Sequence, residues 1–323
     1  MLARVPGIYT WDDHDIFDGW GSHPESIQGN ERYRGIYRAA RKAFLALQCG
    51  GDPLERTPPP LVMRTESDTD TDEPAHVLQA VSMREPTAWM DVLTLDLRSD
   101  RTQSQVLSPR QWWDLKAWFT QYCKDAARAP AAHKHLLIVS SVPVVYLRYA
   151  LSTWILDNLI PGFQTIEDDL LDQWEHPAHE GERARLIMGL LAVQKASGAQ
   201  VTLLSGDVHV AARGRITSSL LAHRGPGKDR SSIDQITTSA IVHSPPTSAE
   251  YQFVETLGTE GPYEVADGVT SQVVDLDSSS TRLRARNFVS IAFDGPGEGS
   301  EGRLWAEWVA EDGVPRRQLI VYP

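Results

Sequence analysis

The sequence predicts an α/β fold with mixed sheets and a β-rich C-terminal end. Segments with apolar residues at helical spacing alternate with short continuous apolar runs, which are typical of buried strands. Near the C-terminus, glycine and proline separate several short segments of strand-like composition. The 323 residues show no internal repeat and are enough for one large domain or two small ones. We therefore expect helices packed against sheets within one domain.

The first half of the chain begins with a short strand predicted at residues 7–11. Apolar residues at spacings of three and four predict an amphipathic helix over residues 31–48. Residues 76–83 and 89–97 have strand-like composition and are expected to pair as a hairpin. Ser108 precedes Pro109 and an aromatic-rich helical pattern, so it is expected to serve as the N-cap of a helix.

The second half contains the segments that we expect at the centre of the sheet. Residues 135–142 and 199–204 are apolar runs typical of buried strands. Between them, residues 180–197 have helical spacing, and Gly198 stands where a helix C-cap is expected. Further strands are predicted at residues 210–216, 233–242, 269–276, 287–294, 304–309 and 318–322, and a loop is the alternative for residues 269–276.

Composition excludes several classes of function. The formal net charge is −12 and lysines or arginines form no run, so nucleic acid is not expected as a partner. The two cysteines indicate no disulfide framework. No apolar run reaches the ~18 residues of a membrane span, and residues 1–6 do not resemble a signal peptide. A cytoplasmic location is the resulting expectation.

Residues 10–21, with the sequence TWDDHDIFDGWG, form the most informative motif of the chain. Four aspartates and a histidine lie among aromatic residues and glycines. Such a group of charges resists burial unless a cation gathers it. A solvated acidic turn is the alternative, but the two tryptophans, the phenylalanine and the isoleucine argue against it. We therefore expect oxygen and imidazole ligands for a metal ion.

A second short motif, residues 206–209 with the sequence GDVH, follows a predicted buried strand. Gly206 is expected to allow a tight turn, and Asp207 and His209 are two residues apart, so on an extended segment they face the same side. A turn aspartate followed by an ordinary strand histidine is the alternative. Because both motifs combine aspartate and histidine, we expect them to meet at one edge of a sheet.

These motifs, together with DLRS at residues 96–99 and SSVP at residues 140–143, resemble the PhoD-type alkaline phosphatases of the calcineurin-like metallophosphoesterase superfamily. The resemblance extends from Pro6 to about Pro246. It implies a metallophosphatase-like αββα sandwich. Residues 1–246 are then expected to be the C-terminal portion of the PhoD-like domain. Residues 247–323 are expected to be a β-rich extension packed on the same domain.

The resemblance also implies roles for individual residues. Asp13 and Asp207 match ligands of the second metal and His209 a ligand of the first. His14 matches the histidine that contacts the phosphoryl oxygen or protonates the leaving group, and Asp15 matches the acid that orients it. Arg98 is expected either to clamp an anionic substrate or to form a structural pair with Asp96.

The implied activity is metal-dependent hydrolysis of a small phosphoester. A metal-activated water attacks phosphorus, the metals offset the charge of the phosphoryl group, and His14 assists departure of the alcohol. Calcium, iron or manganese are the metals that the resemblance suggests. Monoesters and diesters are both possible substrates.

The sequence differs from the family pattern in two places. Ser140 and Ser141 stand where the superfamily often has a histidine. In addition, residues 1–10 contain no acidic residue, whereas the family carries ligands of the first metal and the bridging aspartate upstream of the Asp-His loop. These differences lead to the expectation that the N-terminal portion of the sandwich is missing and that only the C-terminal part of the catalytic domain is represented.

Two functions of different classes remain open from the sequence. The chain is either part of a PhoD-like phosphatase or a non-catalytic metal-binding or interaction module that keeps a relic of the site. An incomplete sandwich is also expected to leave a sheet edge exposed, which a partner or a second copy of the chain would cover.

Overall fold

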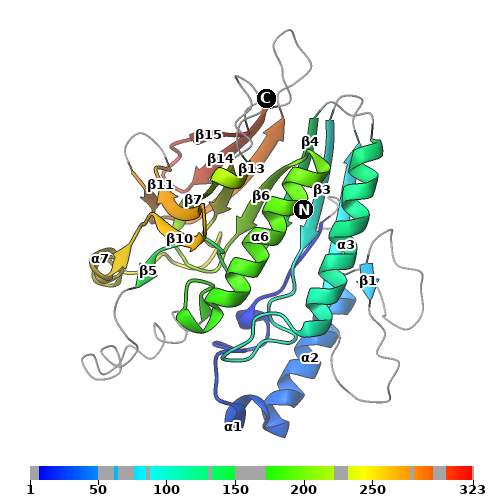
Figure 1. Ribbon diagram of the computed structural model, residues 1–323. Coiled ribbons are helices and arrows are strands. Elements are labelled where there is room, and N and C mark those ends of the chain that lie inside the picture. The colour runs from blue at the N-terminus through cyan, green and yellow to red at the C-terminus, as the bar shows by residue number, and fades with distance from the viewer. Residues whose placement is uncertain are drawn as a thin grey trace.

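The chain folds into two packed β-sheets with helices against one of them, as the computed structural model in Figure 1 shows. The structure describes residues 7–49, 62–64, 76–84, 88–129, 133–149, 172–221, 232–276, 280–293 and 303–321. The α/β class predicted from the sequence is confirmed.

The larger sheet has ten strands within the described ranges, and its centre is parallel. Strand order is β1-β2-β3-β4-β6-β8-β7-β11-β10, and β12 also pairs with β7. The pairs β3–β4, β4–β6 and β6–β8 are parallel, whereas the flanking pairs are antiparallel. The sheet is therefore mixed, as predicted. Its strands are β1 (Val62–Arg64), β2 (Val77–Arg84), β3 (Ala88–Thr94), β4 (His133–Val139), β6 (Gln200–Ser205), β7 (Ala211–Ser218), β8 (Ser232–Thr237), β10 (Tyr263–Ala266), β11 (Val269–Val274) and β12 (Arg282–Leu283).

Two long helices, α3 (Pro109–Arg128) and α6 (Glu180–Ser197), lie side by side across one face of this sheet (Figure 1). The predicted N-terminal end of α3 and the predicted C-terminal end of α6 are both confirmed. Ser108 Oγ accepts a hydrogen bond from the backbone N–H of Gln111 at 3.2 Å, and Gly198 ends α6 with a φ of 69°. The remaining helices are α1 (Glu25–Gln28), α2 (Glu31–Leu47) and α7 (Ser248–Leu257), with short 3-10 turns η2 (Asp13–Asp15), η3 (Pro177–His179) and η4 (Ser219–Leu221).

A second sheet, with strands β13 (Asn287–Phe293), β14 (Leu304–Ala310) and β15 (Arg316–Val321), covers the other face. Strand β4 shows why the layers form, because its side chains alternate between the two faces. Leu136 and Ile138 pack in the cluster that contains residues of α3 and α6, whereas Leu137 packs with Trp308 of β14. These layers are the helix–sheet–sheet part of the predicted sandwich. A further pair, β5 (Arg148–Tyr149) and β9 (Gly258–Thr259), is separate.

Residues 7–11, predicted as a strand, form none in the structure. The segment is held by side chains instead of a backbone ladder. Thr10 Oγ1 donates to the carbonyl of Leu95 at 2.7 Å, and the Tyr9 N–H donates to Oε1 of Gln79 at 3.4 Å. These contacts bring the acidic loop that follows to the ends of the parallel strands. Among the helices of the described ranges, none combines the length and the apolar composition needed to cross a bilayer.

Candidate metal centre

Two buried tryptophans hold the N-terminal acidic loop against the end of β3. Trp11 Nε1 donates to Oδ1 of Asp96 at 2.9 Å, and Trp20 Nε1 donates to the carbonyl of Arg98 at 3.1 Å. Helix α2 supports both indoles, since Tyr37 stacks on Trp20 with ring centroids 4.9 Å apart. The aromatic residues of the motif therefore anchor the loop, and its charged residues are left to form the site.

The 3-10 turn η2 (Asp13–Asp15) fixes the direction of the first acidic side chains. The Asp12 carboxylate accepts from the N–H of Asp13, and the Asp15 carboxylate accepts from the N–H of Asp12 at 2.9 Å, which together form a capping box. Asp13 points inward and is 4% exposed. Its Oδ2 accepts a hydrogen bond from the N–H of Gly19 at 2.8 Å.

The second motif lies in the loop between β6 and β7, and its backbone is strained. Asp207 and His209 have φ values of 72° and 56°, in the left-handed region that residues with a Cβ seldom adopt. Gly206 has no positive φ, and a Cβ there would meet nothing within 4 Å. The tight turn predicted for Gly206 is therefore made by the two candidate ligands themselves. Backbone strain of this kind is concentrated at functional sites.

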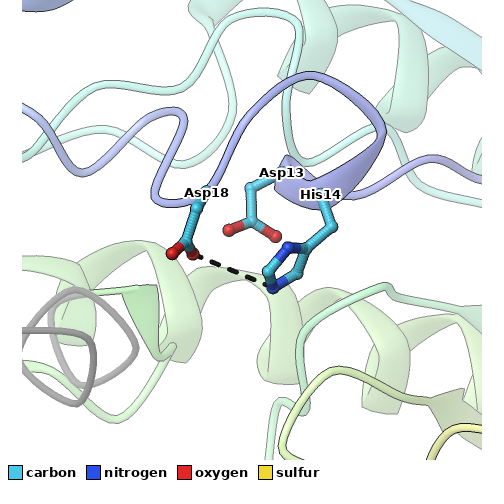
Figure 2. Close-up of side chains that lie close together, drawn as sticks. All are labelled: Asp13, His14 and Asp18. Carbon is cyan, nitrogen blue, oxygen red and sulfur yellow. Dashed lines mark ion pairs between the residues drawn. The ribbon is translucent and has the colours of Figure 1, made fainter. Parts of the chain in front are cut away.

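The two motifs meet at the carboxyl ends of the parallel strands, as predicted. Asp12, Asp13 and Asp207 bring carboxylate oxygens to within 4.8 Å of one another. A second group shares Asp13 and adds His14 and Asp18 within the same limit. Figure 2 shows the side chains of this second group gathered on the N-terminal loop. Asp13 thus belongs to both groups.

A pocket of about 390 Å³ opens beside these groups. His14, Asp18, Asp207 and His209 all line it. The ring of His243 lies edge-on to that of His209, with centroids 4.3 Å apart. Burial, His243 and His14 together lower the pKa of His209, which favours the neutral imidazole that metal binding requires. His209 lines the pocket but belongs to neither of the two converging groups found within the described ranges.

Arg98 occupies a position that the sequence did not predict. The Asp96 carboxylate does not pair with the guanidinium of Arg98. It accepts hydrogen bonds from the backbone N–H groups of Arg98 and Ser99, at 3.1 and 2.9 Å. The Arg98 side chain is fully buried, so it lies away from solvent and from a substrate in the pocket. It ion-pairs with four carboxylates: Asp12, Asp13 at 3.3 Å, Asp172 at 2.5 Å and Asp207 at 3.8 Å. The predicted pair with Asp96 is thus replaced by pairs with these four carboxylates, and the predicted role of Arg98 toward a substrate stays a prediction.

The carboxylates around Arg98 titrate unequally. Burial raises the pKa of Asp207 well above its ordinary value, and the neighbouring Asp12 raises it further. Burial also raises the pKa of Asp12, although Arg98 opposes the shift. Burial disfavours the charged form of Asp172 too, but Arg101 and Arg98 together hold its pKa below the ordinary value. The arginines therefore favour the charged form of Asp172, whereas burial favours the neutral form of Asp12 and of Asp207.

The donor set fits a hard cation. A separate hollow of about 370 Å³ is lined by Asp12, Asp207, Ser140 and Ser141, among others. The hydroxyl of Ser141 is buried and has no hydrogen-bond partner among the described residues. Carboxylate and hydroxyl oxygens are ligands that calcium and manganese accept. The serines that replace the expected histidine therefore suit the oxygen-rich character of this site.

His14 lies at the rim of the pocket with more than half of its side chain exposed. Its Nε2 is 3.8 Å from Oδ1 of Asp18, and this ion pair is drawn in Figure 2. Asp15, expected to orient His14, has its Oδ2 engaged in the cap of η2. The described contacts thus give His14 a different acidic neighbour, and the role of Asp15 stays a prediction.

Sequence reasoning missed two other acidic members of the site. Asp12 was part of the motif but received no role, although the structure places it in the group with Asp13 and Asp207. Asp172 lies in a stretch without a recognisable motif, so no local signal identified it. Its place in the site is recognised from its ion pairs with Arg98 and Arg101.

Comparison with known proteins agrees with the resemblance seen in the motifs. A family model described as PhoD related phosphatase matches residues 1–166 and 153–278. The chain is 27% identical over 294 residues to an uncharacterized protein of Saccharomyces cerevisiae, YGR266W. This alignment covers 77% of the chain and 41% of the yeast protein. The chain therefore spans less than half the length of this curated relative.

Proposed function

The chain belongs to the family of PhoD related phosphatases, and we propose that it is a metal-dependent phosphoester hydrolase. The observation that carries the proposal is the convergence of Asp12 and Asp13 with Asp207, nearly 200 residues later in the sequence, beside a pocket lined by three imidazoles. Carboxyl ends of parallel strands are where α/β folds place their ligands.

Asp13, Asp207 and His209 are the residues that we propose to hold the cation. When bound, a divalent or trivalent ion supplies positive charge that offsets the phosphoryl group and makes water a stronger nucleophile near neutral pH. Calcium, iron and manganese are the proposed candidates. An oxygen-rich set with one neutral imidazole accepts each of them.

His14 is proposed to hold the proton that the departing alcohol takes up. Its position at the rim of the pocket, open to solvent, supports this role. Its acidic neighbour is Asp18, whose Oδ1 lies 3.8 Å from Nε2 of the ring. Asp15 contributes indirectly, because its cap holds the turn that carries His14.

The remaining wall of the pocket suits the alcohol part of a small ester. Tyr146, Tyr149 and Tyr251 line it together with Pro245 and Pro246. Rings of this kind pack against the carbon skeleton of a ligand while the charged end faces the carboxylates and histidines. Arg98 is enclosed and does not contact the ester, so its charge acts on the carboxylates.

Hydrolysis of p-nitrophenyl phosphate and bis-p-nitrophenyl phosphate tests the proposal. The purified chain is expected to release p-nitrophenol when calcium, iron or manganese is added, and a chelator is expected to stop the reaction. Asp13→Ala and Asp207→Ala should abolish turnover. Asp312→Ala is the matched control, because Asp312 is an exposed aspartate whose described partner is Arg316. Turnover that survives both site substitutions would contradict the proposal.

A non-catalytic module is the second candidate, and the enclosure of Arg98 favours it. Because the guanidinium of Arg98 already neutralises part of the negative charge of Asp12, Asp13 and Asp207, fewer metal ions are required to balance that charge. On this hypothesis the chain binds a cation without hydrolysing either ester. Cation binding in a well-folded protein that shows no turnover with any of the three metals would select it.

A further inference from the structure

We propose that the groove between α3 and α6 is a docking site for an amphipathic helix of a partner protein, one that carries acidic residues beside its apolar face. The two helices lie side by side across the large sheet (Figure 1), and the groove between them has a volume of about 600 Å³. Within the described ranges, no residue lines both this groove and the pocket of the metal centre. The inference is therefore independent of the proposed function.

The groove is mainly apolar and has room for side chains of a partner. Helix α3 contributes Leu115 and Phe119 to its lining. Helix α6 contributes small residues, namely Gly189, Ala192 and Ala196. A Cβ added at Gly189 would meet nothing within 4 Å, so there is open space beside α6 at this point. Another helix can pack closely where side chains are small, and its own apolar residues then fill the groove.

Two large apolar side chains that flank the groove are exposed. Trp113 is 73% exposed and lies one helical turn before Lys116 on α3. Met188 is 36% exposed and lies one turn before Ala192 on α6. Residues one turn apart share a face of a helix, so both side chains border the groove. Aromatic residues and methionine are enriched in protein–protein interfaces, which makes a protein surface the fitting occupant.

The charge around the groove selects an acidic partner. Lys116, Lys124 and Arg185 line it, and no acidic residue does so within the described ranges. None of the three forms an ion pair with a carboxylate of the described residues. Arg185 instead lies over the ring of Trp112, at 4.2 Å from its centroid. On a chain with a net charge of −12, this groove is thus a local positive surface that is complementary to acidic side chains.

The positions of the cations favour a helix over an anionic lipid. Lys116 and Lys124 are eight residues apart on α3, which corresponds to about 12 Å along the helix axis. A fatty acid has one charged group and can meet only one of these lysines. Acidic side chains that recur along one edge of a helix have the same spacing and can meet both.

A synthetic helix tests the inference in the absence of an identified partner. The probe is a fluorescein-labelled peptide of about 16 residues, with leucines at helical spacing on one face and glutamates on both sides of that face. Fluorescence anisotropy measures its binding to the full chain. We expect saturable binding, and we expect the same peptide with lysine in place of each glutamate to bind at least about 10-fold more weakly.

Two variants locate the binding in the groove. The double substitution Lys116→Glu with Lys124→Glu should weaken binding of the acidic peptide by about 10-fold or more and favour the basic peptide. Ala192→Glu, which places a carboxylate in the groove, should weaken binding of the acidic peptide in the same way. The matched control is Arg32→Glu with Lys42→Glu, which changes the net charge equally at two exposed positions of α2. Its affinity should stay within about twofold of the wild type.

The wild-type chain alone can overturn the inference, so the test does not depend on the folding of any variant. Equal affinity for the two peptides, or no binding of the acidic one, would overturn it. An equal loss in the control variant would also do so, since the effect would then arise from net charge. Binding of dodecanoate without binding of the acidic peptide would assign the groove to a lipid instead. Ester hydrolysis enters none of these outcomes.

Discussion

Nη1 of Arg98 lies 2.5 Å from Oδ2 of Asp172, and both side chains are buried. The other oxygen of Asp172 is 2.9 Å from Nε of Arg101 and accepts the Ser22 hydroxyl at 2.7 Å. One carboxylate therefore joins two buried arginines to the N-terminal loop. The site depends on this network, because Arg98 in turn contacts the candidate ligands.

Asp172→Asn is expected to lower the free energy of unfolding by about 3 to 5 kcal/mol. The substitution keeps the size of the side chain but leaves two buried guanidiniums without a full counter-charge. Urea denaturation followed by circular dichroism measures the change. Asp312→Asn, on the surface, serves as control and should alter stability by less than about 1 kcal/mol. Equal midpoints for the two variants would show that Asp172 has no such role.

Local pattern was sufficient to predict the elements that pack the core. Residues 180–197 were predicted as a helix, and α6 has the same bounds, because apolar spacing and a C-cap glycine are both local signals. The hairpin formed by β2 and β3 was predicted from strand-like composition, which is also a local signal. Residues 7–11 have strand-like composition, but the structure holds them through side-chain contacts, in which the Tyr9 N–H donates to Gln79 and the Thr10 hydroxyl donates to the carbonyl of Leu95. No local pattern reports such contacts.

The site was predictable where motifs define it and not where distant charges complete it. Asp13 and Asp207 were expected to meet, and they do. Arg98 was expected to face substrate or Asp96, whereas its partners include Asp172, which has no motif. The fold places all of them at one sheet edge, and electrostatic attraction selects the pairs. Such pairing is a property of the three-dimensional arrangement, so spacing along the chain could not reveal it.

A bound cation is expected to stabilise the folded chain. An ion that binds only the folded state raises the free energy of unfolding by about 2.7 kcal/mol at a concentration 100 times its Kd. Thermal melts with increasing Mn²⁺ or Ca²⁺ should therefore show a rising Tm. Asp13→Asn and Asp207→Asn should remove most of this dependence. An unchanged dependence in both variants would place the ion elsewhere.

His14→Ala is expected to affect esters in proportion to how poorly their alcohol leaves. For an alkyl phosphate the loss in kcat should be about 100-fold or more, because the alkoxide needs a proton. For p-nitrophenyl phosphate the loss should be much smaller, since p-nitrophenolate leaves unprotonated. Asp18→Asn should give a weaker effect in the same direction. A uniform loss across all esters would instead indicate that His14 binds the phosphoryl group or the cation.

Trp308→Ala is expected to destabilise the chain by about 3 to 5 kcal/mol, because Trp308 fills the space between the two sheets. Its Nε1 also donates to the carbonyl of Thr237 at 3.0 Å. Trp305→Ala is the matched control, since Trp305 lies on the opposite face of the same strand and is only partly buried. Urea denaturation should show a clearly smaller loss for Trp305→Ala. Similar losses would argue against a core between the sheets.

Glu175 is expected to make stability decrease with rising pH over a defined window. Burial raises the pKa of Glu175 above its ordinary value of 4.5, although Arg183 and Arg148 oppose the shift. Between the unfolded and the folded pKa, the folded state therefore binds more protons than the unfolded state. Linkage then requires the free energy of unfolding to fall as pH rises from about 4.5 toward the folded pKa, and to be independent of this group above it.

Glu175→Gln removes the titration and keeps one side-chain oxygen, which accepts a hydrogen bond from Arg183 or from Arg148 but not from both. As pH rises from 4.5, the wild type should therefore lose stability relative to this variant. Urea denaturation of both proteins at several pH values measures the difference. If the wild type instead gains stability relative to the variant over this range, the arginines outweigh burial and the folded pKa of Glu175 lies below 4.5.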